Sequence, residues 1–144
     1  MRQKGRKSLK KLTKKADVVL ENFKPGTLER WGLGYEALKE VNPSVILTRI
    51  SGYGQTGPYR EKAGFGSVAE AVGGLRYLTG YPDLPPVRVG IAIGDMVAGL
   101  YAVIGTLMAL RYGIMMKKKE GRKWMSLSMN LYLVYWKGCF RNLI

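Results

Sequence analysis

The sequence contains no histidine and a single cysteine. Without histidine it cannot form a His-based catalytic triad, and it offers no zinc site with histidine or cysteine spacing. The lone Cys139 excludes an intramolecular disulfide framework and fits a reducing compartment. No apolar signal segment follows the basic first residues, so we expect a cytoplasmic protein without a metal site.

Long apolar runs are also scarce. The longest, residues 96–110, is shorter than the roughly 20 residues that a membrane-spanning helix needs. With 144 residues and 47% apolar content, the chain is long enough to form one hydrophobic core. The run therefore predicts a buried helix of a globular domain, and we expect no membrane partner.

Acidic residues are few: the chain has 10 against 24 lysines and arginines, a formal charge of +14. The excess lies at the ends, because residues 1–15 contribute +8, residues 114–144 contribute +6, and residues 16–113 are neutral. Basic segments can bind nucleic acid. A non-catalytic basic module that binds nucleic acid or a partner subunit is thus one hypothesis, but the neutral centre weakens it, and we expect no nucleic-acid partner.

The order of periodic segments predicts an α/β fold. Two β-branched runs, residues 17–23 and 45–50, flank helical segments, and this is the βαβ pattern of parallel strands. The expected helices are residues 8–16, 28–31, 35–41, 67–79 and one that begins at Asp95.

A glycine-rich turn follows the second strand, with glycines at 52, 54 and 57. This spacing superficially matches the dinucleotide-binding fingerprint, which must open directly into a helix so that the helix N-terminus meets the pyrophosphate. Here Pro58, Tyr59 and a charged stretch intervene. The turn therefore does not predict a bound nicotinamide cofactor.

Asp95 is the residue best suited to chemistry. It opens an apolar helix, where unpaired N–H groups favour a negative charge. Such a carboxylate could attack an activated carbonyl as a nucleophile. Asp is also among the commonest helix caps, so a purely structural role is the alternative.

Three stretches carry a family resemblance: residues 16–35, residues 50–59, and residues 89–101 around Asp95. Together they resemble the class III CoA-transferases, of the formyl-CoA transferase and carnitine CoA-transferase type, over about residues 16–113. The resemblance implies a partial Rossmann-like parallel sheet with helices, a fragment of that fold. It implies transfer of coenzyme A from an acyl-CoA thioester to a free carboxylic acid, with the CoA thioester as substrate and no permanently bound cofactor.

The resemblance also assigns roles to residues. Asp95 matches the family's catalytic aspartate, which forms a mixed anhydride and then an aspartyl-CoA thioester. Arg30 and Trp31 match positions that line the CoA site. Tyr53, Gly54 and Gln55 match the loop near the acyl and CoA groups. A solvated helix charge is the alternative for Arg30, and turn chemistry alone is the alternative for the loop.

One departure separates this chain from a sister family. The α-methylacyl-CoA racemases resemble it around Asp95 but pair the aspartate with a histidine, and the matching position here is Phe65. The chain therefore lacks the racemase pair. The transferases often have Gly-Tyr-Asp where this chain has Gly64, Phe65 and Gly66.

The resemblance further implies a chain that is only part of a larger enzyme. Residues 1–113 correspond to a central part of the CoA-transferase large domain, and intact members form interlocked homodimers. We expect this segment alone to be inactive. Residues 114–144 form an atypical basic tail, which we interpret as translated out of frame, because a one-base shift would restore a family strand across residues 124–130.

Overall fold

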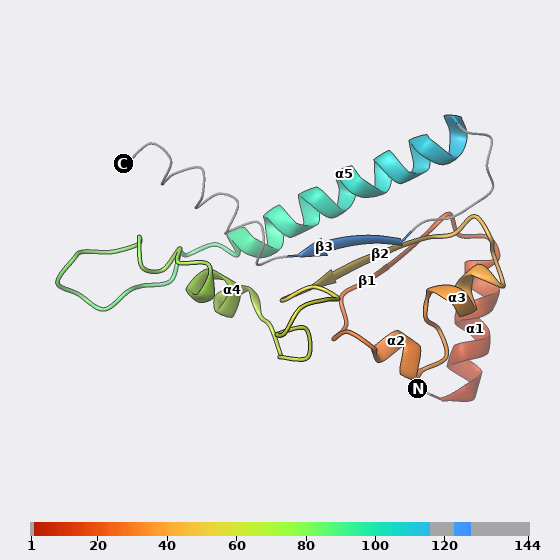
Figure 1. Cartoon of the computed structure of the whole chain (residues 1–144), viewed down its shortest axis with the longest axis horizontal. Helices are drawn as coiled ribbons and strands as arrows, with labels where there is room; N and C mark the ends of the chain where they lie inside the picture. Colours follow the sequence, from red (N-terminus) through yellow and green to blue (C-terminus); the bar gives the residue numbers. More distant parts are fainter. Residues whose placement is uncertain (1, 116–122, 128–144) are drawn as a thin grey trace.

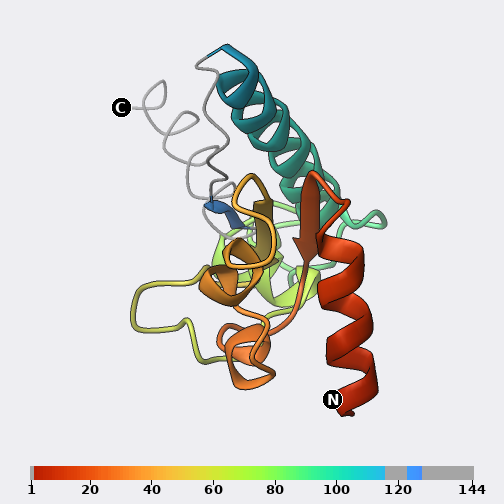
Figure 2. The ribbon, with the colours of Figure 1, turned by 90° about the vertical axis from the view of Figure 1, so that its right-hand side faces the viewer.

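The computed structural model describes residues 2–115 and 123–127 (Figure 1). They form a three-stranded parallel sheet in the order β1-β2-β3, which confirms the predicted α/β fold. Helix α5 lies on one side of the sheet, and α2 and α3 lie on the other (Figures 1 and 2). In chain order the elements are α1 (Gln3–Thr13), β1 (Val18–Glu21), α2 (Thr27–Arg30), α3 (Tyr35–Lys39), β2 (Ile46–Ser51), α4 (Gly66–Val72), α5 (Ile93–Met115) and β3 (Lys123–Leu127).

The middle strand, β2, is buried along almost its whole length. It pairs with β1 through Val18 opposite Ile46 and with β3 through Leu47 opposite Lys123. Parallel strands covered on both faces are mostly apolar rather than alternating, and the two buried polar residues of the run at 45–50, Thr48 and Arg49, both have partners. β3 falls where the out-of-frame hypothesis places the family strand, and that hypothesis stays a prediction. Residues 128–144 of the expected tail lie outside the described residues.

The face that α2 and α3 cover holds the hydrophobic core. Its members are fully or almost fully buried: Leu28, Leu33, Tyr35, Leu38, Val45 and Leu47. Trp31 and Val19 pack against this cluster from its edge. Because side chains alternate along a strand, Val45 and Leu47 point to the same side, toward the two short helices.

The opposite face packs against α5 through small side chains. Gly94, Ala98, Ala102 and Gly105 are its buried residues, and they recur at helical spacing. The hydroxyl of Thr48 on β2 lies 2.7 Å from that of Thr106 on α5. Small residues let the helix approach the strands closely, and the hydroxyl contact joins the middle of α5 to β2.

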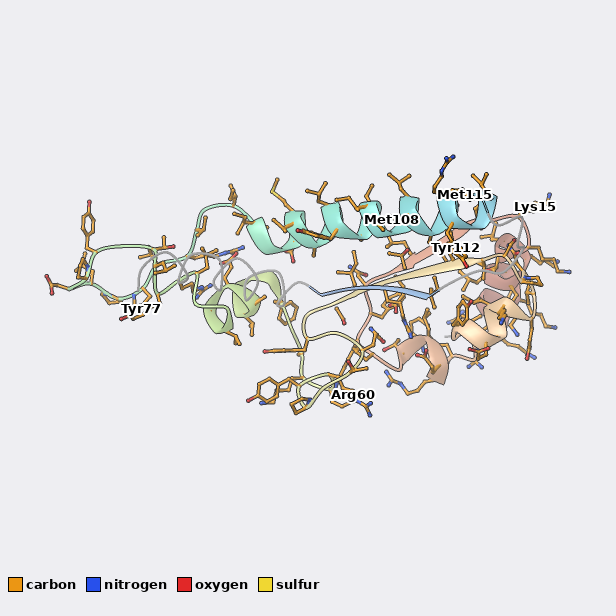
Figure 3. The ribbon with its side chains drawn as sticks, turned by 45° about the horizontal axis from the view of Figure 1, so that its top comes forward. Lys15, Arg60, Tyr77, Met108, Tyr112 and Met115 are labelled. Carbon is orange, nitrogen blue, oxygen red and sulfur yellow. The ribbon has the colours of Figure 1, made fainter. Side chains whose placement is uncertain are left out.

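The expectation of a buried apolar helix at 96–110 is wrong in one respect. Many large side chains of α5 are exposed, including Leu100 and Leu107 and, as Figure 3 shows, Met108 and Met115, because the buried positions of the helix hold only glycine and alanine. By length and composition α5 is the one helix among the described residues that could cross a membrane. Mostly buried core helices of soluble proteins pass the same test, whereas only 22% of the apolar window of α5 is buried in this structure.

All five expected helices differ in their bounds, and α5 begins at Ile93, two residues before Asp95; only α1 and α4 differ by more than two residues at an end. α1 begins at Gln3 and ends at Thr13, where Asn42 Nδ2 donates to the carbonyl oxygens of Thr13 and Ala16 at 3.0 and 2.9 Å. α4 ends at Val72 rather than Thr79. Gly74 has a φ of 80°, a left-handed conformation that stops the helix.

A charged cluster ties α2 to the sheet. Arg49 on β2 donates to Glu21 Oε1 at 2.6 Å and to both carboxylate oxygens of Glu29 at 2.8 and 2.9 Å. Burial lowers the pKa of Arg49, but the hydrogen bonds to Glu29 and Glu21 and their charges outweigh it, so the net pKa is raised. The cluster therefore holds the start of α2 near the carboxyl ends of β1 and β2.

Candidate active site

Two glycines close the loop that follows β2. A Cβ on Gly52 would lie 2.6 Å from the Cα of Gly64, and one on Gly64 would lie 2.7 Å from the Cα of Gly52. No other residue fits this backbone crossing, since real Cβ atoms essentially never come so close. Gly54 and Gly57 have φ values of 82° and 90°. The glycine spacing thus serves loop geometry, and the next helix begins only at Gly66.

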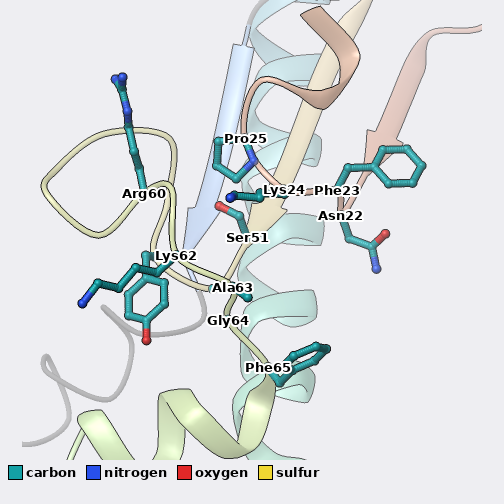
Figure 4. Close-up of a pocket in the computed structure, with 12 residues that line it drawn as sticks. Asn22, Phe23, Lys24, Pro25, Ser51, Arg60, Lys62, Ala63, Gly64 and Phe65 are labelled. Carbon is teal, nitrogen blue, oxygen red and sulfur yellow. The ribbon is translucent and has the colours of Figure 1, made fainter. Parts of the chain in front are cut away.

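The base of this loop borders a pocket of about 270 Å³ (Figure 4). Three segments line it: the one after β1, the end of β2, and the one before α4. Its cations are Lys24, Arg60 and Lys62, and no carboxylate is among the lining residues. The full lining is Asn22, Phe23, Lys24, Pro25, Ser51, Gly52, Tyr53, Arg60, Lys62, Ala63, Gly64 and Phe65. A pocket of this charge suits an anionic ligand.

Tyr53 is the predicted loop residue that lines the pocket. Its ring meets that of Tyr59 edge to face at 5.7 Å, and Lys62 Nζ lies 4.1 Å from the Tyr59 ring centre. Gly54 is buried, and Gln55 Nε2 donates to Ser51 Oγ at 3.3 Å. These two residues support the loop without lining the pocket.

The predicted CoA-site pair, Arg30 and Trp31, lies at the end of α2 and outside the pocket lining. Arg30 is exposed, and its Nη2 donates to Thr27 Oγ1 at 2.9 Å. Trp31 is half-buried against the core and meets Phe23 edge to face at 5.2 Å. Because Phe23 lines the pocket, Trp31 supports one wall of it.

Asp95 lies in the first turn of α5 and is exposed. Its carboxylate rests against Gly66, because a Cβ there would lie 2.7 Å from Oδ2 and 3.0 Å from Oδ1. Gly66 directly follows Phe65, the last lining residue of the pocket. The carboxylate therefore lies against the residue that follows the pocket lining in the chain, and it is open to solvent.

Sequence reasoning missed the pocket's three cations. Lys24 lies in the stretch that carries the family resemblance, but its proximity to Arg60 and Lys62 depends on the closure of the loop at Gly52 and Gly64. The net charge of the sequence does not reveal these three cations as a cluster, because residues 16–113 are neutral as a whole.

Glu70 on α4 was also missed. Its side chain is fully buried, and neither carboxylate oxygen has a hydrogen-bond partner among the described residues. Arg76 and Arg88 approach Glu70 Oε2 at 3.8 and 3.7 Å. The sequence signal that could have identified Glu70 is a single acidic residue in the mostly apolar stretch 67–72. The charge cluster brings the segment after α4 back toward α4.

Comparison with known proteins identifies the family. The sequence matches CoA-transferase family III over residues 1–125. This chain belongs to that family. The match is longer at both ends than the resemblance predicted, and it takes in α1 and the first residues of β3.

Family III relatives of known activity cover most of this chain. Succinyl-CoA–D-citramalate CoA-transferase of Chloroflexus aurantiacus is 58% identical over 106 residues, covering 74% of this chain and 26% of that protein. Human succinyl-CoA:glutarate CoA-transferase is 46% identical over 119 residues, covering 83% of this chain and 26% of the relative. The chain therefore spans about a quarter of the length of these curated relatives.

A solved family structure confirms the fold. The crystal structure of a CAIB/BAIF family protein from Brucella suis superposes with a TM-score of 0.86 at 39% identity. The alignment covers 92% of this chain and 34% of that one. The predicted part of the class III CoA-transferase fold is thereby confirmed.

Proposed function

We propose that this chain supplies the nucleophile and part of the CoA site of an enzyme that moves coenzyme A between carboxylic acids. The observation that carries the proposal is the exposed Asp95 carboxylate against Gly66, the residue that follows the lining of a pocket with three cations and no acid. Transfer of coenzyme A requires a nucleophile for the thioester carbonyl and a site for the anionic groups of the substrate. Asp95 and the cationic pocket would supply these two parts.

Asp95 would act in two half-reactions. Its carboxylate oxygen attacks the carbonyl carbon of the thioester. The C–S bond breaks, CoA leaves as the thiolate, and the acyl group stays on Asp95 as a mixed anhydride. The thiolate attacks the aspartyl carbonyl, which releases the first acid and leaves an aspartyl-CoA thioester. The acceptor carboxylate attacks that thioester, which releases the CoA thiolate and forms a second mixed anhydride. The thiolate then attacks the acceptor's acyl carbon, which gives the new acyl-CoA and frees the Asp95 carboxylate.

The pocket residues would bind and orient the substrate. Lys24 and Lys62 offer N–H donors for phosphate or carboxylate oxygens, and Arg60 offers the guanidinium nitrogens that its pair with Glu61 leaves available. Tyr53 provides an aromatic edge at the pocket, and Gln55 braces the loop through Ser51. Arg30 and Trp31 extend the CoA site from α2, with Trp31 held against Phe23.

The relatives suggest the substrate class. The names of the two relatives above pair succinyl-CoA with citramalate or glutarate, which are dicarboxylic acids. We infer that the donor is a succinyl-CoA-type thioester and the acceptor a small dicarboxylic acid. A second carboxylate on either would pair with the cationic pocket.

Turnover would need more than the described residues, because the relatives are about four times as long as the matched segment. We therefore expect the chain alone to form an adduct at most, without completing transfer. In a complete enzyme the partner would be a second subunit, in the interlocked homodimer that the family resemblance implies.

The direct test is covalent labelling. The chain, and a chimera in which its residues 16–113 replace the matching segment of the citramalate enzyme, are incubated with succinyl-CoA. We expect the chimera to gain a CoA adduct that mass spectrometry of its peptides maps to Asp95. Asp95→Ala should abolish the adduct, and Asp83→Ala, which removes another exposed acid, should leave it unchanged.

Labelling that persists in Asp95→Ala would reject the nucleophile. Absence of any adduct in a folded chimera would reject the proposed function as a whole.

A further inference from the structure

We propose that Gly66 is a positioning residue for Asp95. The proposal rests on the function proposed above, and it concerns how the carboxylate is held against the start of α4. Gly66 supplies no chemistry of its own. The transferases often carry an Asp at this position, whereas in this chain the lack of a side chain at Gly66 leaves the space that the Asp95 carboxylate occupies.

The distances define that space. A Cβ on Gly66 would lie 2.7, 3.0 and 3.1 Å from Oδ2, Oδ1 and Cγ of Asp95, and these are its three nearest heavy atoms. Nothing else would be crowded as closely. An alanine at 66 would therefore displace the carboxylate and leave the surrounding backbone in place.

The backbone of Gly66 does not itself require glycine. Its φ lies outside the left-handed region in which Gly54, Gly57 and Gly74 are found. It begins α4 after Phe65, a position that alanine adopts readily. The effect of Gly66→Ala is thus steric and local, unlike a substitution at those left-handed glycines.

Gly99 provides the matched control. It lies one helical turn beyond Asp95 on the same helix, and a Cβ there would meet no atom within 4 Å. Gly99→Ala adds the same methyl group to the same region and leaves the Asp95 carboxylate untouched.

The first measurement is the rate of CoA adduct formation with succinyl-CoA in the chimera described above. A displacement of the nucleophile by about 1 Å can cost a factor of up to about a hundred, so we expect Gly66→Ala to slow labelling at least about tenfold. CoA affinity, measured by calorimetry, should not change, because the pocket does not include Gly66. Gly99→Ala should match the unsubstituted protein in both measurements.

The second measurement does not depend on activity. The full chain is treated with a carbodiimide and an amine, and coupling at each carboxylate is followed by mass spectrometry. Gly66→Ala should change the coupling rate at Asp95 relative to Asp83 in the same sample, because the displaced carboxylate changes its surroundings. Gly99→Ala should leave this ratio unchanged.

The outcomes separate the two proposals. Normal labelling in Gly66→Ala, with none in Asp95→Ala, would overturn the role of Gly66 and leave the proposed function standing. Labelling that survives Asp95→Ala would overturn the function, and the carbodiimide ratio would then decide on Gly66 alone. An unchanged ratio in Gly66→Ala overturns the positioning role in every case.

Discussion

Glu21 and Glu70 are both buried, and both face arginine, but their surroundings differ. Glu21 accepts from Arg49 Nε at 2.6 Å and from the backbone N–H of Phe23 at 2.7 Å. Glu70 meets Arg76 and Arg88 only at 3.8 and 3.7 Å, without a hydrogen bond. A buried charge is stabilised when hydrogen bonds replace its hydration. We therefore call the hydrogen-bonded cluster of Glu21 the complete cluster, and that of Glu70, which has only the longer ion pairs, the loose cluster.

The same contrast separates the regions around them. Residues 16–51 contain the core cluster and the hydrogen-bonded charges. Residues 52–115 contribute Ala69, Ala98 and Ala102 to the buried apolar set, and they expose large side chains such as Phe65, Tyr77 and Leu100. The first region therefore holds the hydrophobic core, whereas the second carries Asp95 and has less burial to stabilise it.

The largest expected effect comes from breaking the complete cluster. Arg49→Met leaves Glu21 buried without its cation, and we expect a loss of about 3–5 kcal/mol in the free energy of unfolding, measured with urea. The contribution should not vary with pH near neutrality. Because the pKa of Arg49 is raised in the folded state, its stabilising effect is present below the ordinary arginine pKa and is lost only as the pH rises through the folded value.

Arg60→Met is the control for that variant. Its pair with Glu61 is exposed, so the change should cost less than about 1 kcal/mol. Equal losses for the two variants would contradict the contrast between buried and exposed pairs.

The next effect compares two leucines. Leu38 is fully buried under the sheet, and Leu38→Ala should cost about 2–5 kcal/mol through lost burial and a cavity. Leu100 on α5 is 59% exposed, and Leu100→Ala should change stability by less than about 0.5 kcal/mol. Urea unfolding of both variants tests this. A large loss at Leu100 would mean that the outer face of α5 is covered in solution.

The smallest effect concerns the loose cluster. Glu70→Gln keeps the shape of the side chain and removes a charge that has no hydrogen bond, so we expect a change within about 1 kcal/mol, of either sign. Glu21→Gln should cost more, because it weakens two short hydrogen bonds. Thermal unfolding of the two variants measures the difference, and an equal loss would show that Glu70 is as well satisfied as Glu21.

Much of the fold could be predicted from local pattern. The β-branched run at 45–50 and the segment around Val18 became neighbouring parallel strands, because a helical crossover between two such runs has few alternatives. The bounds of α4 could not be predicted as easily. Gly73 and Gly74 weaken a helix without determining where it stops, and the left-handed turn at Gly74 is a feature of the folded chain.

The candidate site divides in the same way. Asp95 could be singled out because an acid that opens an apolar helix is a local signal, and the loop at 52–57 because its glycines are close in sequence. The pocket could not be predicted from the sequence, because Lys24 and Lys62 are brought together by the crossing of Gly52 and Gly64. Arg30 and Trp31 lie outside the lining, and their place in the CoA site stays a prediction.

By itself, the sequence determined the α/β class, the two neighbouring strands, the family and the helix that presents Asp95, because each depends on residues within one or two adjacent segments. Tertiary structure decided which face of α5 meets the sheet, which cations line the pocket, and that Gly66 makes room for the carboxylate. Those features are distances between side chains far apart in the chain, and such distances exist only after the backbone has folded.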